Sequence, residues 1–151
     1  MTGKGTTVSD ASTMYLGSDD TAIKRLLENM QRIAVVGISL KEERASHGIA
    51  RFLIGQGFDV VGVNPALTEA LGVPVYPRLA DVPGKIDIVD IFRRSDAVPA
   101  IVDDAIAKQV GVVWMQEGVV HEEAAAKAAA AGIDVVMDHC LYQEWLRLMN
   151  A

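Results

Sequence analysis

The chain has 151 residues, half of them apolar, which is enough for one domain with a full hydrophobic core. Its formal net charge of −6 disfavours nucleic acid and anionic membranes as partners, and no apolar stretch reaches the roughly 18 residues that a membrane span needs. The N-terminus has no apolar segment of signal-peptide length, and a single cysteine, Cys140, excludes an internal disulfide and is typical of the reducing cytoplasm, where we expect the protein.

The first predicted elements are a tail and a helix. Residues 1–17 are rich in Thr, Ser and Gly and have few apolar anchors, which predicts a mobile tail. Ser18, followed by Asp19 and Asp20, is typical of a helix start, with the Ser18 hydroxyl as the cap and the acids near the positive end of the helix dipole. Apolar residues then recur at helical spacing, namely Ile23, Leu26, Leu27 and Met30. We therefore predict a single domain over residues 18–151.

After this helix the sequence alternates between strand-like and helix-like segments. The predicted strands are short, β-branched and almost continuously apolar, as expected for strands buried on both faces; they are 32–37, 59–63, 87–92, 111–115 and 134–138. The predicted helices are 46–56, a short piece at 66–71 or 78–81, 96–109, 121–131 and 141–149, the last with Leu141, Trp145, Leu148 and Met149 on one face. Gly57 and Gly132 stand where helices are expected to end.

This alternation predicts an α/β fold, a Rossmann-like doubly wound five-stranded parallel sheet with the order 3-2-1-4-5 and helices on both faces. In such a sheet, ligands bind beyond the carboxyl ends of the strands, at the point where the strand order reverses. The residues at these ends are Gly37-Ile38-Ser39, Asn64-Pro65, Phe92-Arg93-Arg94, Gln116-Glu117-Gly118 and Asp138-His139-Cys140. Strand ends lead into loops, and loops are polar in any fold, so this pattern alone does not establish a site.

The loop after the first predicted strand lacks the usual dinucleotide fingerprint. That fingerprint needs G-x-G-x-x-G at the first turn and an acid about 20 residues later to hold the ribose hydroxyls. Here Gly37 has no partner glycine until Gly48, and the second strand ends in Asn64-Pro65 instead of Asp or Glu. Both departures disfavour a standard NAD site.

The same loop nevertheless gathers groups that bind phosphate. Gly37 lets the backbone approach a ligand closely, and Ser46 is placed to cap the following helix, whose first N–H groups would face a phosphate. The polar side chains on this loop and on the neighbouring strand end are Ser39, Lys41, Arg44, Ser46, His47, Arg93 and Arg94. Glu42 and Glu43 dilute the positive charge, so a solvated charged turn remains an alternative on spacing alone.

Five motifs follow one another along residues 20 to 145, namely VGIS with the following K, R and S (36–46), VGVNP (61–65), VDIFRR (89–94), VWMQEGV (113–119) and GIDVVMDHC (132–140). In this order they resemble the small stand-alone CoA-binding proteins, which are similar to the CoA-binding domain of the succinyl-CoA ligase α subunit. The resemblance implies a Rossmann-like fold that binds coenzyme A. It implies phosphates on the first loop (Gly37, Ile38, Ser39, Lys41, Arg44), the nucleotide beside Asn64, Pro65, Phe92 and Arg93, and the pantetheine arm near Gln116 and Gly118. Ile38 departs from the alanine that is common in this family and would be bulkier beside the phosphate path.

With Ser46 and His47 from the loop itself, these residues form the predicted coenzyme A site. We predict no catalytic and no metal-binding residues, because no Ser/His/Asp order, metal-ligand spacing or carboxylate pair stands out. Asp138, His139 and Cys140 are adjacent in a strand-like segment, so their side chains would point to alternating faces. The sequence favours binding without catalysis but does not decide whether the protein is an enzyme.

Two alternatives remain open. One is an NAD(P)-binding oxidoreductase with a divergent Rossmann site, in which Arg44 or Arg93 takes a 2′-phosphate. The other is a regulatory subunit that senses acyl-CoA and acts through an unidentified protein partner. The sequence does not distinguish free CoA from an acyl ester.

Overall fold

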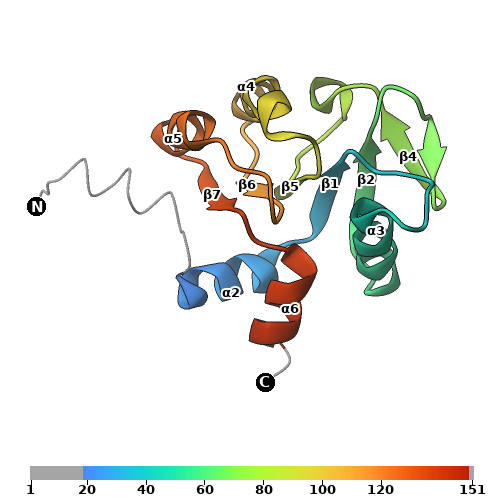
Figure 1. Cartoon of the computed structure of the whole chain (residues 1–151), viewed down its shortest axis with the longest axis horizontal. Helices are drawn as coiled ribbons and strands as arrows, with labels where there is room; N and C mark the ends of the chain where they lie inside the picture. Colours follow the sequence, from blue (N-terminus) through green and yellow to red (C-terminus); the bar gives the residue numbers. More distant parts are fainter. Residues whose placement is uncertain (1–18, 150–151) are drawn as a thin grey trace, which may run out of the picture.

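The computed structural model describes residues 19–149, so the predicted mobile tail lies outside the described residues. A twisted sheet forms the middle layer, with helices above and below it (Figure 1). The elements are α2 (Asp20–Asn29), β1 (Arg32–Val36), α3 (Ala45–Gly55), β2 (Asp59–Val63), β3 (Glu69–Ala70), β4 (Val73–Tyr76), η1 (Leu79–Asp81), β5 (Ile88–Ile91), η2 (Ser95–Ala97), α4 (Val98–Lys108), β6 (Val112–Met115), α5 (Glu122–Ala130), β7 (Asp134–Met137) and α6 (Leu141–Met149). None of the helices in this part of the chain has the length and apolar character that a membrane crossing requires.

All five predicted strands are present, but the sheet has seven strands, in the order β3-β4-β2-β1-β5-β6-β7. The predicted order 3-2-1-4-5 is therefore wrong for those five strands. The third of them, β5, pairs in parallel with β1, with Val89 opposite Ala34, instead of lying outside β2. The five predicted strands thus run 2-1-3-4-5 across the sheet.

The error comes from the segment between β2 and β5, where the prediction was one short helix. Residues 69–76 instead form an antiparallel hairpin, β3 and β4, followed by the short 3-10 helix η1. Pro74 conceals the strand character of β4, since proline is confined to edges and strand ends. β4 pairs in parallel with β2, so the six parallel strands have the order 3-2-1-4-5-6. The strand order therefore reverses between β1 and β5, which is where ligands bind in open sheets of this kind.

The sheet separates two apolar cores. One lies under α4, α5 and η1, and the other under α2, α3 and α6 (Figure 1). The predicted face of α6 is confirmed, because Leu141 is fully buried and Trp145, Leu148 and Met149 pack against the second core. Gly57 and Gly132 follow α3 and α5 with φ of +91° and +86°, the left-handed conformation expected after a helix end.

Two predicted helix caps are wrong by one or two positions. Asp19, not Ser18, occupies the N-cap of α2, and its carboxylate accepts a 3.1 Å hydrogen bond from the N–H of Ala22. Arg44, not Ser46, precedes α3, and it makes no side-chain cap. Ser46 lies within the first turn of α3 and is buried, so its hydroxyl does not close the helix end. The end of α3 that faces the sheet edge therefore keeps free N–H groups.

Candidate functional site

A cavity of about 660 Å³ opens at the carboxyl ends of the parallel strands, between the loops that follow β1 and β5. It brings together most of the predicted site residues, namely Gly37, Ile38, Ser39, Lys41, Arg44, Ser46, Asn64, Pro65, Phe92, Arg93 and Gln116. Ala45, Arg94, Glu117 and Val119 also line it. The sequence analysis named Arg94 as a possible source of positive charge but did not include it, or the other three, in the predicted coenzyme A site, although each lies in a segment that it identified. Four loops from distant parts of the sequence thus meet at one hollow.

His47 and Gly118 do not line this cavity and instead support its loops. His47 is buried, and its Nδ1 lies 2.8 Å from the carbonyl oxygen of Ser39. The N–H of Gly118 donates a 2.7 Å hydrogen bond to the carboxylate of Asp138, which joins the loop after β6 to the end of β7. In this structure both residues support the loops around the cavity.

The loop after β1 turns away from the strand at Gly37, which has φ of +93°. Its N–H donates to the carbonyl of Val63 at 2.9 Å, so the turn is fastened to the end of β2. Further along, the Ser39 hydroxyl accepts from the N–H of Lys41, and the Lys41 carbonyl accepts from the N–H of Arg44, both at 3.0 Å. These bonds hold the loop in one shape before any ligand arrives.

The loop leads directly into α3. At the start of any α-helix the first N–H groups have no intrahelical acceptor, and the helix dipole makes this end positive. In α3 the first such groups belong to Ala45 and Ser46, and both residues line the cavity. Such an arrangement suits an anion such as phosphate.

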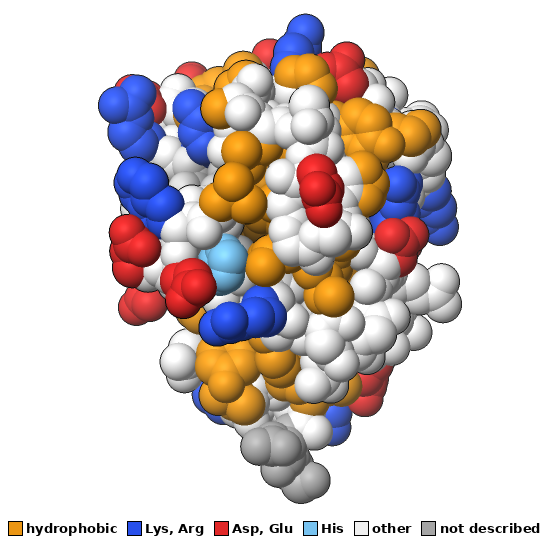
Figure 2. Space-filling view, turned by 90° about the vertical axis from the view of Figure 1, so that its right-hand side faces the viewer, with side chains coloured by type: hydrophobic (Ala, Val, Ile, Leu, Met, Phe, Trp, Pro, Cys, Tyr) orange, Lys and Arg blue, Asp and Glu red, His pale blue; other side chains and the backbone are white. Residues whose placement is uncertain are grey.

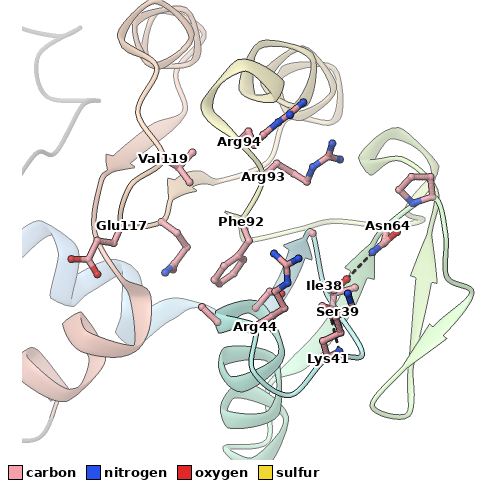
Figure 3. A pocket seen from close by; sticks show the side chains of 15 residues that line it. Ile38, Ser39, Lys41, Arg44, Asn64, Phe92, Arg93, Arg94, Glu117 and Val119 are labelled. Atoms are coloured by element: carbon pink, nitrogen blue, oxygen red, sulfur yellow. Dashed lines mark hydrogen bonds between the residues drawn. The ribbon is translucent and has the colours of Figure 1, made fainter.

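Asn64 connects the loop after β2 to the loop after β1. Its Nδ2 donates to the carbonyl of Ile38 at 2.8 Å (Figure 3). Its Oδ1 accepts from the N–H of Ala66 at 2.8 Å. An Asp at this position has no N–H to donate to Ile38. The residue that replaces the expected ribose-binding acid therefore fixes the shape of the first loop.

Ile38 lies at the cavity, but its side chain is fully buried beneath the loop. It fills the space above Gly62, where an added Cβ would come within 2.7 Å of Ile38 Cγ2 and within 2.9 Å of Val75 Cγ2. The Ile38 side chain, which was expected to lie beside the phosphate path, is thus directed into the core. Gly62 on β2 provides the room for it.

We expect Gly62→Ala to lower the free energy of unfolding by about 1–3 kcal/mol, because the added methyl overpacks the contact with Ile38 and Val75. The double variant Gly62→Ala/Ile38→Ala should be more stable than the sum of the two single changes implies, since the second change removes the clash at Ile38. Urea unfolding of all three variants measures this coupling. Strictly additive effects would contradict the proposed contact.

The cavity is rich in positive charge although the protein is acidic overall. Lys41, Arg44, Arg93 and Arg94 line it, against the single acid Glu117. Figure 3 shows Arg44 and Arg93 reaching in from different loops, with the carboxylate of Glu117 directed away from both. By contrast, cationic and anionic side chains are interspersed over the face drawn in Figure 2. Local positive charge in a hollow favours an anionic small ligand over an extended polyanion.

A second, smaller hollow of about 340 Å³ adjoins the cavity, and Pro65 and Arg93 line both. Its walls are mainly apolar, formed by Val36, Val63, Pro77, Leu79, Ala97, Ala100 and Ile101. At its edge Arg78 and Asp104 form an ion pair of 2.8 Å. We refer to it below as the side pocket. Its walls suit a flat, weakly polar group joined to an anion in the main cavity.

A family model described as CoA binding domain matches residues 31–145 of the chain. The uncharacterised protein YneT of Bacillus subtilis is 39% identical over 119 residues, which cover 79% of this chain and 88% of that protein. A solved structure of a hypothetical protein from Pyrococcus horikoshii is 38% identical, with a TM-score of 0.83, over 86% of this chain and 92% of that one. These similarities extend over nearly all of the described domain.

A part of a larger enzyme is also similar. The ADP-forming acetate–CoA ligase I of Archaeoglobus fulgidus is 32% identical over 87 residues. The match covers 57% of this chain but only 13% of the ligase. The shared segment is therefore a small portion of a protein whose remaining parts have no counterpart in this match.

Proposed function

The chain belongs to the family of CoA-binding domains, and from that premise we propose that it binds coenzyme A, or an acyl-CoA, in the cavity between the loops after β1 and β5. The observation that carries the proposal is the phosphate-binding character of that cavity. Four cationic side chains and the free N–H groups at the start of α3 converge there in a protein of net charge −6. Coenzyme A has a diphosphate and a 3′-phosphate that match such a site.

The layout of the two hollows gives the ligand a direction. We place the diphosphate on the loop of residues 37–46 and at the N-terminus of α3. The adenine then occupies the side pocket, where apolar walls from β1, β2 and α4 would cover its ring. The pantetheine arm runs the other way, past Phe92 towards Gln116 and Val119 at the end of β6.

We propose binding without a catalytic step by this chain, in the cytoplasm. The competing ligand class is a nicotinamide dinucleotide. The end of β2 carries Asn64, whose amide is bonded to Ile38 and Ala66, in place of an acid that would accept from the ribose hydroxyls. This difference favours coenzyme A over NAD.

Thermal unfolding in the presence of each ligand tests the proposal. A ligand that binds only the native state raises the melting temperature as its concentration increases. We expect coenzyme A to do so, with NAD and NADP far less effective at equal concentration. A larger shift with NAD or NADP than with coenzyme A would overturn the proposal.

We expect Arg44→Ala and Lys41→Ala each to lower the affinity for coenzyme A by about 10- to 100-fold, because a charge-assisted phosphate contact contributes roughly 1.5–3 kcal/mol. Both side chains are exposed on the loop, so unfolding should be almost unchanged. Calorimetric titration at two salt concentrations should also show a shallower salt dependence in the variants.

Lys85→Ala is the matched control, since Lys85 is exposed in the loop that precedes β5, at the opposite edge of the sheet. It removes one positive charge without touching the cavity. If Lys41→Ala and Arg44→Ala bind coenzyme A as tightly as Lys85→Ala does, the loop is an ordinary solvated turn.

A further inference from the structure

Gln116 has a fixed orientation at the end of β6. It is buried, with 5% of its surface exposed, and its backbone N–H donates to the carbonyl of Ile91 at 3.2 Å. Its side-chain Oε1 accepts a 3.0 Å hydrogen bond from the N–H of Leu141, the first residue of α6. A backbone N–H can only donate, so the oxygen and not the nitrogen of the amide must face Leu141.

This bond determines where the other end of the amide lies. Nε2 makes no hydrogen bond to any residue in the described part of the chain, yet it is not among the polar atoms sealed inside the protein there. Gln116 lines the main cavity. The exposed remainder of this nearly buried side chain is therefore its NH₂ group, which opens on the cavity as a donor of two hydrogen bonds.

The surroundings of this donor differ from those of the phosphate site. Phe92 and Val119 line the cavity close to it, since the N–H of Gln116 donates to Ile91, the residue before Phe92, and the Gln116 carbonyl accepts from the N–H of Val119 at 2.8 Å. The carboxylate of Glu117 on the same loop is directed away from the labelled arginines (Figure 3). Of the groups proposed to bind phosphate, Lys41, Arg44 and the N-terminus of α3 belong to the loop after β1 and the helix that follows it. Arg93 and Arg94 follow β5, and Figure 3 shows their side chains extending away from Val119 and Glu117. A neutral donor beside apolar walls suits a carbonyl oxygen better than a phosphate.

We propose that the Gln116 NH₂ group donates a hydrogen bond to a carbonyl oxygen of the ligand's pantetheine arm or of the acyl thioester at its end. The inference rests on the proposed function and adds a specificity-determining residue to it. Leu141 acts as the positioning partner, because its N–H holds the amide in the donor orientation. A carbonyl acceptor has two sources here, the amides present in every coenzyme A and the thioester present only in an acyl-CoA.

Calorimetric titrations with adenosine 3′,5′-bisphosphate, coenzyme A and acetyl-CoA separate these sources. Gln116→Glu keeps an oxygen for Leu141 and replaces the donor by an acceptor, and Gln116→Met removes the donor without adding charge. We expect both variants to weaken the binding of acetyl-CoA by about tenfold or more, and that of coenzyme A by as much if the acceptor is a pantetheine amide. Adenosine 3′,5′-bisphosphate, which has no arm, should bind as it does to the wild type.

The pattern across ligands then identifies the acceptor. If coenzyme A and acetyl-CoA lose affinity equally, the acceptor is a pantetheine amide. If only acetyl-CoA loses affinity, the acceptor is the thioester. Unchanged affinity for both ligands, or an equal loss with adenosine 3′,5′-bisphosphate, would overturn the role of Gln116. Gln143→Glu on the exposed side of α6 makes the same chemical change away from the cavity and should change none of these affinities.

A second measurement needs no variant. In NMR spectra of the wild-type protein, the side-chain NH₂ signal of Gln116 should shift on addition of coenzyme A or acetyl-CoA and not of adenosine 3′,5′-bisphosphate. No shift with either larger ligand would contradict the contact. If the wild type binds no coenzyme A at all, the proposed function fails. If it binds coenzyme A but the Gln116 variants keep the wild-type affinities, only this inference fails.

Discussion

Gly37→Val is expected to abolish measurable coenzyme A binding, a loss of at least about two decades in affinity, while the sheet still forms. Gly37 has φ of +93°, which a β-branched residue avoids, and its Cβ would lie 3.3 Å from Arg93 Cδ and 3.4 Å from the backbone of Phe92. The valine would therefore strain the turn and push the loops after β1 and β5 apart. Because these loops form the two sides of the cavity, the phosphate site should be lost.

Gly132→Val is the matched control for this change. Gly132 has φ of +86°, and no atom of the described part of the chain lies within 4 Å of an added Cβ. It follows α5, away from the cavity, so its replacement introduces similar backbone strain, about 1–3 kcal/mol, without altering the site. Calorimetric titration of both folded variants decides the matter: loss of binding in both would mean that general destabilisation explains the result for Gly37.

Replacing Asp90 should stabilise the protein more than any other single change discussed here. Asp90 lies within β5, fully buried, and neither carboxylate oxygen has a hydrogen-bond partner among residues 19–149. Its strand neighbours are Val35 and Trp114, so it is surrounded by apolar groups. Burial raises the pKa of this carboxyl well above its ordinary value of 3.8. Asp90→Val removes an unsatisfied polar group and should raise the free energy of unfolding by at least about 2 kcal/mol at pH 7.

The same residue should give the stability of the wild type a distinctive pH dependence. Because the pKa of Asp90 is higher in the folded state, the unfolded chain loses this proton first as the pH rises above 3.8. The contribution of Asp90 to the free energy of unfolding then falls by about 1.4 kcal/mol per pH unit, until the pH reaches the folded-state pKa. Below pH 3.8 the effect is absent.

Asp90→Asn tests whether Asp90 makes the wild type less stable as the pH rises, because the amide keeps a buried polar group but does not titrate. The wild type and Asp90→Asn should have similar stability at acidic pH, with the wild type becoming the less stable of the two as the pH increases. Urea unfolding at a series of pH values measures the difference. A difference that is independent of pH would contradict a neutral, buried Asp90.

The core of the fold could be predicted from the sequence because its signals are local. Each buried strand is a short β-branched run, and α6 has an apolar face repeated at helical spacing, so both types of element were found with ends correct to one residue. β4 was missed because Pro74 interrupts it and because its partner strand β3 has only two residues. Missing that one strand shifted β5 to the wrong side of β1 in the predicted order.

The part of the candidate site that lies at the strand ends could be predicted from the sequence. The rule that ligands bind at the carboxyl edge identified the loops, and glycine and arginine residues distinguished the first of them. Side-chain directions depended on residues far away in the sequence. Gly62 lets Ile38 turn into the core and Leu141 orients Gln116, and no local pattern reveals such pairs.

A crystal structure of the protein with coenzyme A is the most direct test of the account. We predict the diphosphate against the backbone of residues 37–46 and the N-terminus of α3, the adenine in the side pocket, and the pantetheine arm extending towards Gln116. Coenzyme A bound anywhere else on the molecule, or in this cavity with its diphosphate away from Gly37 and Arg44, would contradict the account.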